Sequence, residues 1–135
     1  MVLAIMGLPG TGKTFLAGHL SERINAYHTN TDSTRIKWGM EGRYTLEDKM
    51  EVYQRMFYDA EQHLAYFNHC IIEATFSQQF FREMARSFFS ERGVDIHFIE
   101  VIADDRVVKQ RLSKPRNDSE ANYHVYRKMK NSFEP

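Results

Sequence analysis

The chain has 135 residues, with 18 basic and 18 acidic side chains and 42% hydrophobic residues. This length favours one domain with its own core, and the balanced charge is not that of a protein whose main role is to hold a long polyanion. The single cysteine, Cys70, excludes an internal disulfide and a cysteine-rich metal site. No apolar run reaches membrane-spanning length and the N-terminus lacks a signal-peptide pattern, so we expect a soluble cytoplasmic protein without a membrane or protein partner.

The chain begins with the patterns of a buried strand and a glycine-rich turn. Val2–Met6 is a continuous apolar run, which is typical of a strand buried on both faces. Residues 7–14, GLPGTGKT, then match the P-loop pattern G-x-x-x-x-G-K-[ST]. Apolar residues continue at helical spacing as far as Ile24. The sequence therefore predicts a strand, a phosphate-binding loop and a helix in succession.

The residue types of this loop suit a bound nucleotide. Glycines let successive backbone N–H groups face one centre, and the N-terminus of the following helix adds positive charge there. Lys13 is expected to reach the β- and γ-phosphates, and the Thr14 hydroxyl to be a Mg²⁺ ligand. A glycine-rich turn without a ligand is the alternative, but such a turn requires neither the lysine nor the threonine. The residues predicted to bind the nucleotide are Leu8, Pro9, Gly10, Thr11, Gly12, Lys13, Thr14 and Phe15.

The remainder of the chain alternates between strand and helix patterns. Further strands are predicted over residues 26–30, 70–74 and 95–103. Helices are predicted over residues 33–40, 46–67, 79–92 and 104–112, and a last helix begins at Ser119 after a polar loop. Strands separated by helices predict a parallel sheet with helices on both faces. We therefore expect one α/β domain over residues 1–135, a P-loop NTPase three-layer αβα sandwich with a mostly parallel sheet of four to five strands.

Charged residues recur where the predicted strands end, which is where ligands bind in such folds. Asp32 and Arg35 follow the second strand, and Glu73 lies at the end of the third. This layout suits phosphoryl transfer, which needs a metal, a base near an acceptor hydroxyl and mobile cations over the transferring group. The candidates at this edge are Asp32, Arg35, Glu73, Thr75, Arg111 and Arg116.

Each of these candidates also has an alternative explanation. Asp32 suits the cap of the helix that begins near residue 33, and exposed arginines are common on helices and at their C-termini. Glu73 ends an apolar run, where an unpaired charge is costly, so it needs a partner. Metal-bound water, Lys13 and a buried salt bridge are the alternatives for that partner. The six histidines lack ligand spacing, and none is predicted to form a site.

Four segments occur in an order seen in one family: GLPGTGKT, TNTDSTR, CIIEATFSQQFFR and VVKQRLSKPRNDSEANYHVYRKM. Over nearly its whole length the chain resembles the small P-loop kinases grouped with polynucleotide 5′-hydroxyl kinase, zeta toxin and chloramphenicol phosphotransferase. The first segment is shared with many NTPases. The second and fourth together are more selective, and they are most similar to the phage-type polynucleotide kinase domain.

The resemblance implies an ATP-dependent kinase that uses Mg²⁺ and transfers the γ-phosphate to a hydroxyl of a small molecule, a nucleotide or an oligonucleotide 5′ end. It implies that Asp32 is the general base and that Arg35 grips an anion of the acceptor. It also implies a helical lid over about residues 106–118 that closes over the donor phosphates. The catalytic candidates are then Lys13, Asp32, Arg111 and Arg116, with Asp32, Arg35, Glu73 and Thr75 at the substrate and Thr14 and Glu73 at the metal.

Two departures from the family pattern affect these expectations. Family members often end the third strand with an aspartate, where this chain has Glu73. Either the glutamate substitutes, with one more methylene to place, or metal assistance rests on Thr14 and waters. The family usually adds another strand and turn after the lid helix, so the chain is either a compact form or truncated at its C-terminus. The alternative function is a nucleotide-binding switch or weak ATPase without a kinase acceptor.

Overall fold

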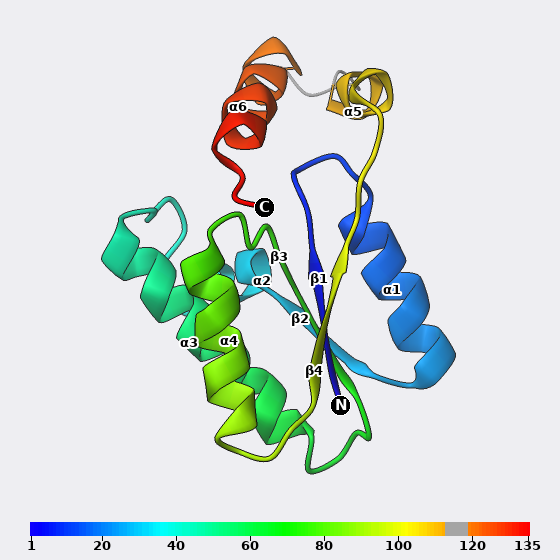
Figure 1. Ribbon diagram of the computed structural model, residues 1–135, viewed down its shortest axis with the longest axis vertical. Helices are drawn as coiled ribbons and strands as arrows, with labels where there is room; N and C mark the ends of the chain where they lie inside the picture. Colours follow the sequence, from blue (N-terminus) through cyan, green and yellow to red (C-terminus); the bar gives the residue numbers. More distant parts are fainter. Residues whose placement is uncertain (113–118) are drawn as a thin grey trace.

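Helices cover both faces of a central sheet, and two further helices lie beyond one of its edges (Figure 1). The computed structural model describes residues 1–112 and 119–135, with side chains over 1–112 and 123–135. The strands are β1 (Val2–Met6), β2 (Tyr27–Asn30), β3 (Cys70–Ala74) and β4 (Ile96–Glu100). The helices are α1 (Lys13–Ile24), α2 (Thr31–Lys37), α3 (Leu46–His63), α4 (Gln79–Ser90), α5 (Asp105–Leu112) and α6 (Ser119–Ser132).

The strands form one parallel sheet in the order β2-β3-β1-β4. The register places Met6 of β1 beside Ala74 of β3 and Glu100 of β4, so the carboxyl ends of these strands meet at one edge. In Figure 1, α1 covers one face of the sheet, whereas α3 and α4 cover the other. The predicted α/β fold with a parallel sheet is thus confirmed, with four strands in the described part of the chain.

The alternation of β1 divides the core between the two faces of the sheet. Val2, Ala4 and Met6 join a large buried cluster with α3 and α4, whereas Ile5 joins a small cluster with Ala17 of α1. The larger cluster also contains the aromatic residues Tyr53, Phe57, Phe76, Phe81 and Phe89. These aromatic side chains are therefore part of the core that holds α3 and α4 against the sheet.

Helix α2 begins at Thr31, earlier than the predicted helix over 33–40, because Asn30 caps it. The Asn30 side-chain oxygen accepts a hydrogen bond from the Ser33 backbone N–H at 2.7 Å, and the Ser33 hydroxyl accepts one from the Asn30 backbone N–H at 3.4 Å. Asp32 therefore lies inside the first turn, and its side chain is 91% exposed. The alternative in which Asp32 caps this helix is wrong.

Several elements are shorter than their sequence patterns predict: β2 begins at Tyr27 rather than at 26, α4 ends at Ser90 rather than at 92, and α3 and β4 are each four residues shorter. Helix α3 ends at His63 rather than at residue 67, because the backbone N–H groups of Ala65 and Tyr66 bond three residues back, to the Gln62 and His63 carbonyls at 3.4 and 2.9 Å. Strand β4 covers Ile96–Glu100 rather than 95–103, because its ladder with the five-residue β1 ends at Glu100. In both cases the apolar periodicity continues beyond the hydrogen-bonded element.

Helices α5 and α6 lie beyond the carboxyl edge of the sheet (Figure 1). Asp105 of α5 accepts hydrogen bonds from the Tyr126 hydroxyl at 2.7 Å and from the Lys130 ammonium at 2.6 Å, both on α6. The chain end returns to α4, where Arg82 donates to the Glu134 carbonyl at 2.5 Å. These contacts hold α6 over the edge at which the candidate site residues converge. None of the described helices is both long and apolar enough to cross a membrane.

Candidate active site

The loop between β1 and α1 has the form of an anion-binding nest. Gly10 and Gly12 have φ values of 80° and 97°, in the left-handed region that favours glycine. The Thr11 hydroxyl donates to the Leu8 carbonyl at 2.7 Å and tightens the turn. Gly12 is the N-cap of α1, and no described side chain caps that end. The first amide N–H groups of the helix are therefore available to a ligand.

Lys13 extends into this site and is partly buried. Burial lowers the pKa of Lys13 below its ordinary value, and the nearby negative charges of Glu73 and Asp32 oppose that effect. Lys13, Glu73 of β3 and Asp32 of α2 all line the same cavity. A phosphate chain in the P-loop would meet this cation at the start of α1.

Glu73 of β3 is 3% exposed, and both of its carboxylate oxygens have partners. One oxygen accepts a hydrogen bond from the Thr14 hydroxyl, and the other lies 3.0 Å from Nε2 of His28. Burial by itself raises the pKa of Glu73, but the hydrogen bonds from His28 and Thr14 lower it below its ordinary value. The predicted need for a partner is therefore met by a histidine and by the P-loop threonine.

Asp32 and Arg35 lie one turn apart on α2, with 4.0 Å between Arg35 Nη1 and Asp32 Oδ1. The aspartate side chain is 91% exposed, whereas the arginine side chain is 9% exposed. Arg35 Nε is buried and has no hydrogen-bond partner among the described residues. The guanidinium lies 4.5 Å from the ring centroid of Tyr44. Arg35 is thus a buried cation with an unused donor, which is the state expected of a group that binds an anion.

A single cavity connects these groups. It has a volume of about 740 Å³ and is bounded by the P-loop, α2, α3, the end of β3 and α6. The predicted site residues that line it are Pro9, Lys13, Thr14, Asp32, Arg35, Glu73 and Thr75. Part of the predicted donor side, Pro9, Lys13 and Thr14, therefore shares one cavity with the predicted acceptor-side residues.

Arg111, in the last turn of α5, reaches the other side of the P-loop. Its Nη1 donates to the Gly10 carbonyl at 3.1 Å, and its side chain lines a second cavity of about 420 Å³ together with Phe15. The Phe15 side chain is 73% exposed there. Arg116 and the remainder of the predicted lid, residues 113–118, lie outside the described residues.

Thr14 and Glu73 supply hard oxygen ligands of the kind that Mg²⁺ prefers. Within residues 1–112 and 123–135, no group of three or more His, Cys, Asp or Glu side chains is arranged to hold a metal ion. Such a group is not required, because Mg²⁺ in phosphoryl-transfer enzymes is commonly held by one or two protein oxygens together with substrate phosphates and waters. The two residues therefore fit a nucleotide-bound Mg²⁺.

Several residues of the site had no distinctive sequence signal. His28 contacts Glu73 only because β2 pairs with β3 in this register, which no local pattern encodes. Tyr44 and Lys49 line the large cavity from the segment that joins α2 to α3 and from α3 itself, and Lys128 lines it from α6. Alternation along β2 predicts which side of the sheet His28 faces, but not its partner.

The family described as AAA domain matches residues 2–135 of the chain. The chain belongs to this AAA domain family. The resemblance to small P-loop kinases is thereby confirmed. No curated protein matches the sequence of this AAA domain significantly.

Solved structures share the fold of this AAA domain at low sequence identity. The APS kinase CysC of Mycobacterium tuberculosis, in complex with AMPPNP and APS, has a TM-score of 0.73 and 21% identity over 84% of this chain and 68% of that chain. A sugar kinase from Janibacter sp. has a TM-score of 0.73 and 19% identity over 99% of this chain and 78% of its own. A chain of the Pnkp1/Rnl/Hen1 RNA repair complex has a TM-score of 0.67 and 19% identity, and the match covers 98% of this chain but 46% of that one. These likenesses show the P-loop kinase fold.

Proposed function

We propose that this protein is an ATP-dependent kinase that transfers the γ-phosphate to a hydroxyl of an anionic acceptor, which is a small molecule, a nucleotide or an oligonucleotide 5′ end. The proposal rests on one cavity in which the P-loop lysine, an exposed aspartate and a buried arginine meet. A nucleotide switch needs only the P-loop. Asp32 and Arg35 have a chemical use when a second substrate, the acceptor, enters the same cavity.

The donor end is built by the P-loop and α5. The free amides at the start of α1 suit the phosphates of ATP, and Lys13 and Arg111 both lie at that loop. Thr14 and Glu73 are the residues that would hold Mg²⁺. When bound, the ion supplies positive charge against the β- and γ-phosphate oxygens.

Asp32 is the proposed general base, because its carboxylate is exposed within the cavity. The acceptor O–H proton passes to this carboxylate while the acceptor oxygen forms its bond to the γ-phosphorus. The bond between that phosphorus and the β–γ bridging oxygen breaks, and ADP leaves with the electron pair. Lys13 and Arg111 stabilise the negative charge that develops on the transferred group and on the leaving oxygen.

The acceptor end of the cavity is cationic. Arg35, Lys49 and Lys128 line it, and the described lining contains no carboxylates besides those of Asp32 and Glu73. Arg35 also has a hydrogen-bond donor, Nε, without a partner among the described residues. These features support an acceptor that carries a phosphate, sulfate or carboxylate group.

The test is transfer of label from γ-labelled ATP–Mg²⁺ to candidate acceptors: 5′-hydroxyl oligonucleotides, nucleotides, sugar nucleotides and sugar acids. We expect a labelled product with at least one anionic acceptor. Asp32→Ala should lower its rate by about 10²–10⁴-fold, while ADP affinity stays unchanged. Asp95→Ala, which removes an exposed carboxylate outside the cavity, is the matched control and should keep full activity.

Two outcomes would contradict the proposal. ATP binding without labelled product from any acceptor would favour the nucleotide switch. Transfer that continues at the normal rate in Asp32→Ala would remove Asp32 from the role of general base, even if the protein is a kinase.

A further inference from the structure

The carboxylate at the end of β3 belongs to a glutamate, and a glutamate is harder to hold in place than an aspartate. P-loop enzymes commonly use an aspartate for the Mg²⁺ of the nucleotide. Glu73 has one more rotatable bond, so its carboxylate can occupy more positions for the same backbone. A carboxylate that serves a metal ion needs one orientation, and a neighbouring group must supply that restraint.

His28 is placed by the sheet to supply such a restraint. In the register of β2 and β3, His28 lies beside Ile71, two residues before Glu73, so Ile71 and Glu73 face the same side of the sheet. The imidazole therefore reaches diagonally across the strand pair to the carboxylate. The distance from His28 Nε2 to Glu73 Oε2 is 3.0 Å, and the two side chains are 21% and 4% exposed.

The two hydrogen bonds of Glu73 act at different oxygens. Thr14 bonds to Oε1 and His28 to Oε2, so the plane of the carboxylate is held at two points. An ionised carboxylate only accepts hydrogen bonds, so His28 Nε2 must carry the proton in this contact. Without the imidazole, Glu73 would keep the Thr14 contact and its last torsion would be free. A buried oxygen would also lose its partner.

We propose that His28 is a positioning residue that holds the Glu73 carboxylate in the orientation which, together with Thr14, serves the Mg²⁺ of a bound nucleotide. This role rests on the proposed function only in assigning a Mg²⁺–nucleotide to the P-loop. His28 itself contacts neither the metal nor the substrates in this role, because it acts through Glu73.

The experiment measures metal binding directly, so it does not depend on finding the acceptor. Mg²⁺ is titrated into the ADP complex by calorimetry, and Mn²⁺ binding to the same complex is followed by electron paramagnetic resonance. His28→Phe removes the donor but keeps a ring of similar size, and it should weaken metal binding by about 10–100-fold. His28→Gln keeps an N–H donor at a similar reach, and it should restore affinity to within about threefold of the wild type. Metal-free ADP should bind equally well to all three proteins.

Two controls separate positioning from a general effect on the fold. His97→Phe changes an exposed histidine on β4 and should leave metal affinity unchanged. In a Glu73→Ala background, His28→Phe should have no further effect, because its role passes through the missing carboxylate. If His28→Phe does not fold, His28→Leu compared with His28→Gln gives the same contrast between an apolar side chain and a donor.

The proposal is overturned if folded His28→Phe binds the metal as tightly as the wild type. It is also overturned if the loss persists in full when Glu73 is already alanine, or if His28→Gln is as weak as His28→Phe. Metal binding that depends on His28, without transfer to any acceptor, would contradict the proposed kinase but support this role. Phosphoryl transfer to an acceptor, together with a metal affinity that does not depend on His28, would support the proposed kinase but contradict this role of His28.

Discussion

Arg111 of α5 donates a hydrogen bond from Nη1 to the Gly10 carbonyl at 3.1 Å, which places a cation of α5 directly on the P-loop. The contact is exposed, so the guanidinium can exchange a backbone oxygen for a phosphate oxygen when a nucleotide binds. We expect Arg111→Ala to lower kcat by about 10²–10³-fold, because it removes a cation from the developing charge. The KM for ATP should change much less. Steady-state kinetics at saturating acceptor would measure both constants.

The control for this prediction lies on the same helix. Arg106 is 96% exposed and lines neither of the P-loop cavities, so Arg106→Ala should leave kcat unchanged. Arg111→Lys should recover only part of the activity, because lysine lacks the planar fork of donors. An Arg111→Ala enzyme with a normal kcat would exclude the arginine from the transfer step.

Arg35 should act on the acceptor rather than on ATP. Its side chain is buried against the cavity, and Nε lacks a partner among the described residues. Arg35→Lys keeps the charge but removes Nε and the planar contact with Tyr44. We expect the KM for an anionic acceptor to rise by about tenfold or more, with the KM for ATP unchanged. Arg23→Lys, at the exposed end of α1, is the matched control. Equal changes in both KM values would instead indicate a general disturbance of α2.

The parts of the site that sequence predicts best are those encoded by adjacent residues. The P-loop carries its own geometry in Gly10, Gly12 and the helix that follows, so the pattern alone locates it. Asp32 and Arg35 are one helical turn apart, so any helix over that segment brings them together. The alternation of strands and helices predicts the parallel sheet for the same reason.

The parts that sequence does not predict depend on contacts between distant elements. The bond between His28 and Glu73 needs the register of β2 against β3, and a shift of that register would separate them. Lys128 lines the large cavity only because α6 packs over the sheet edge. Boundaries also depend on local caps, since Asn30 and not Asp32 begins α2.

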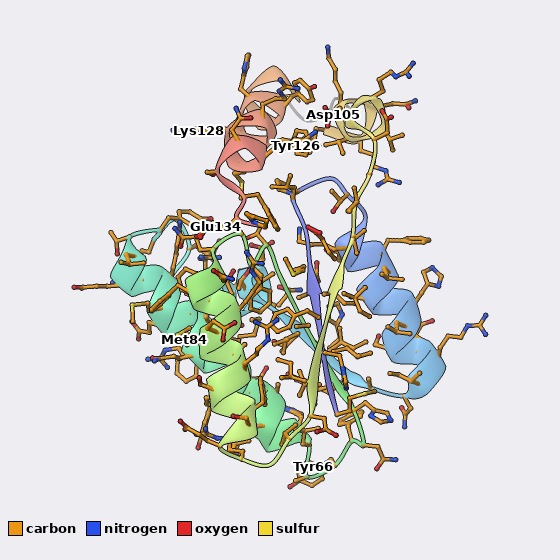
Figure 2. The ribbon with its side chains drawn as sticks, in the orientation of Figure 1. Tyr66, Met84, Asp105, Tyr126, Lys128 and Glu134 are labelled. Atoms are coloured by element: carbon orange, nitrogen blue, oxygen red, sulfur yellow. The ribbon has the colours of Figure 1, made fainter. Side chains whose placement is uncertain are left out.

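Asp105 couples α5 to α6 in a pH-dependent way. Figure 2 shows Asp105 and Tyr126 at the contact between the two helices. Hydrogen bonds from Lys130 and Tyr126 lower the pKa of Asp105 below its ordinary value. A lowered pKa means that the contact is fully stabilising above the unfolded value of about 4 and is lost as the pH falls through the lower folded value. We therefore expect amide hydrogen exchange in α6, corrected for intrinsic rates, to accelerate below about pH 4.

The variant Asp105→Asn tests the same coupling at neutral pH. The substitution removes the charge, so the backbone amides of α6 should exchange faster than in the wild type at pH 7. Lowering the pH should then accelerate their exchange much less than it does in the wild type. Asp95→Asn changes an exposed carboxylate just before the amino end of β4, at the opposite end of the strand from α5 and α6 (Figure 1), and should behave as the wild type. If amide exchange in α6 of Asp105→Asn accelerates in acid as much as in the wild type, the transition belongs to another carboxylate.

Gly7 is required by a close approach between the P-loop and the residue after β4. A Cβ at this position would lie 2.7 Å from the Val101 carbonyl oxygen, and the Val101 backbone N–H is tied to the Met6 carbonyl at 2.8 Å. Because neither strand can move without breaking that bond, Gly7→Ala should lower the free energy of unfolding in urea by about 1–3 kcal/mol. Gly18→Ala is the matched control, since nothing lies within 4 Å of its added Cβ in the middle of α1. It should raise stability by about 0.5–1 kcal/mol. A Gly7→Ala protein as stable as the wild type would show that the backbone after β4 yields easily, and the P-loop would then not depend on that strand for its shape.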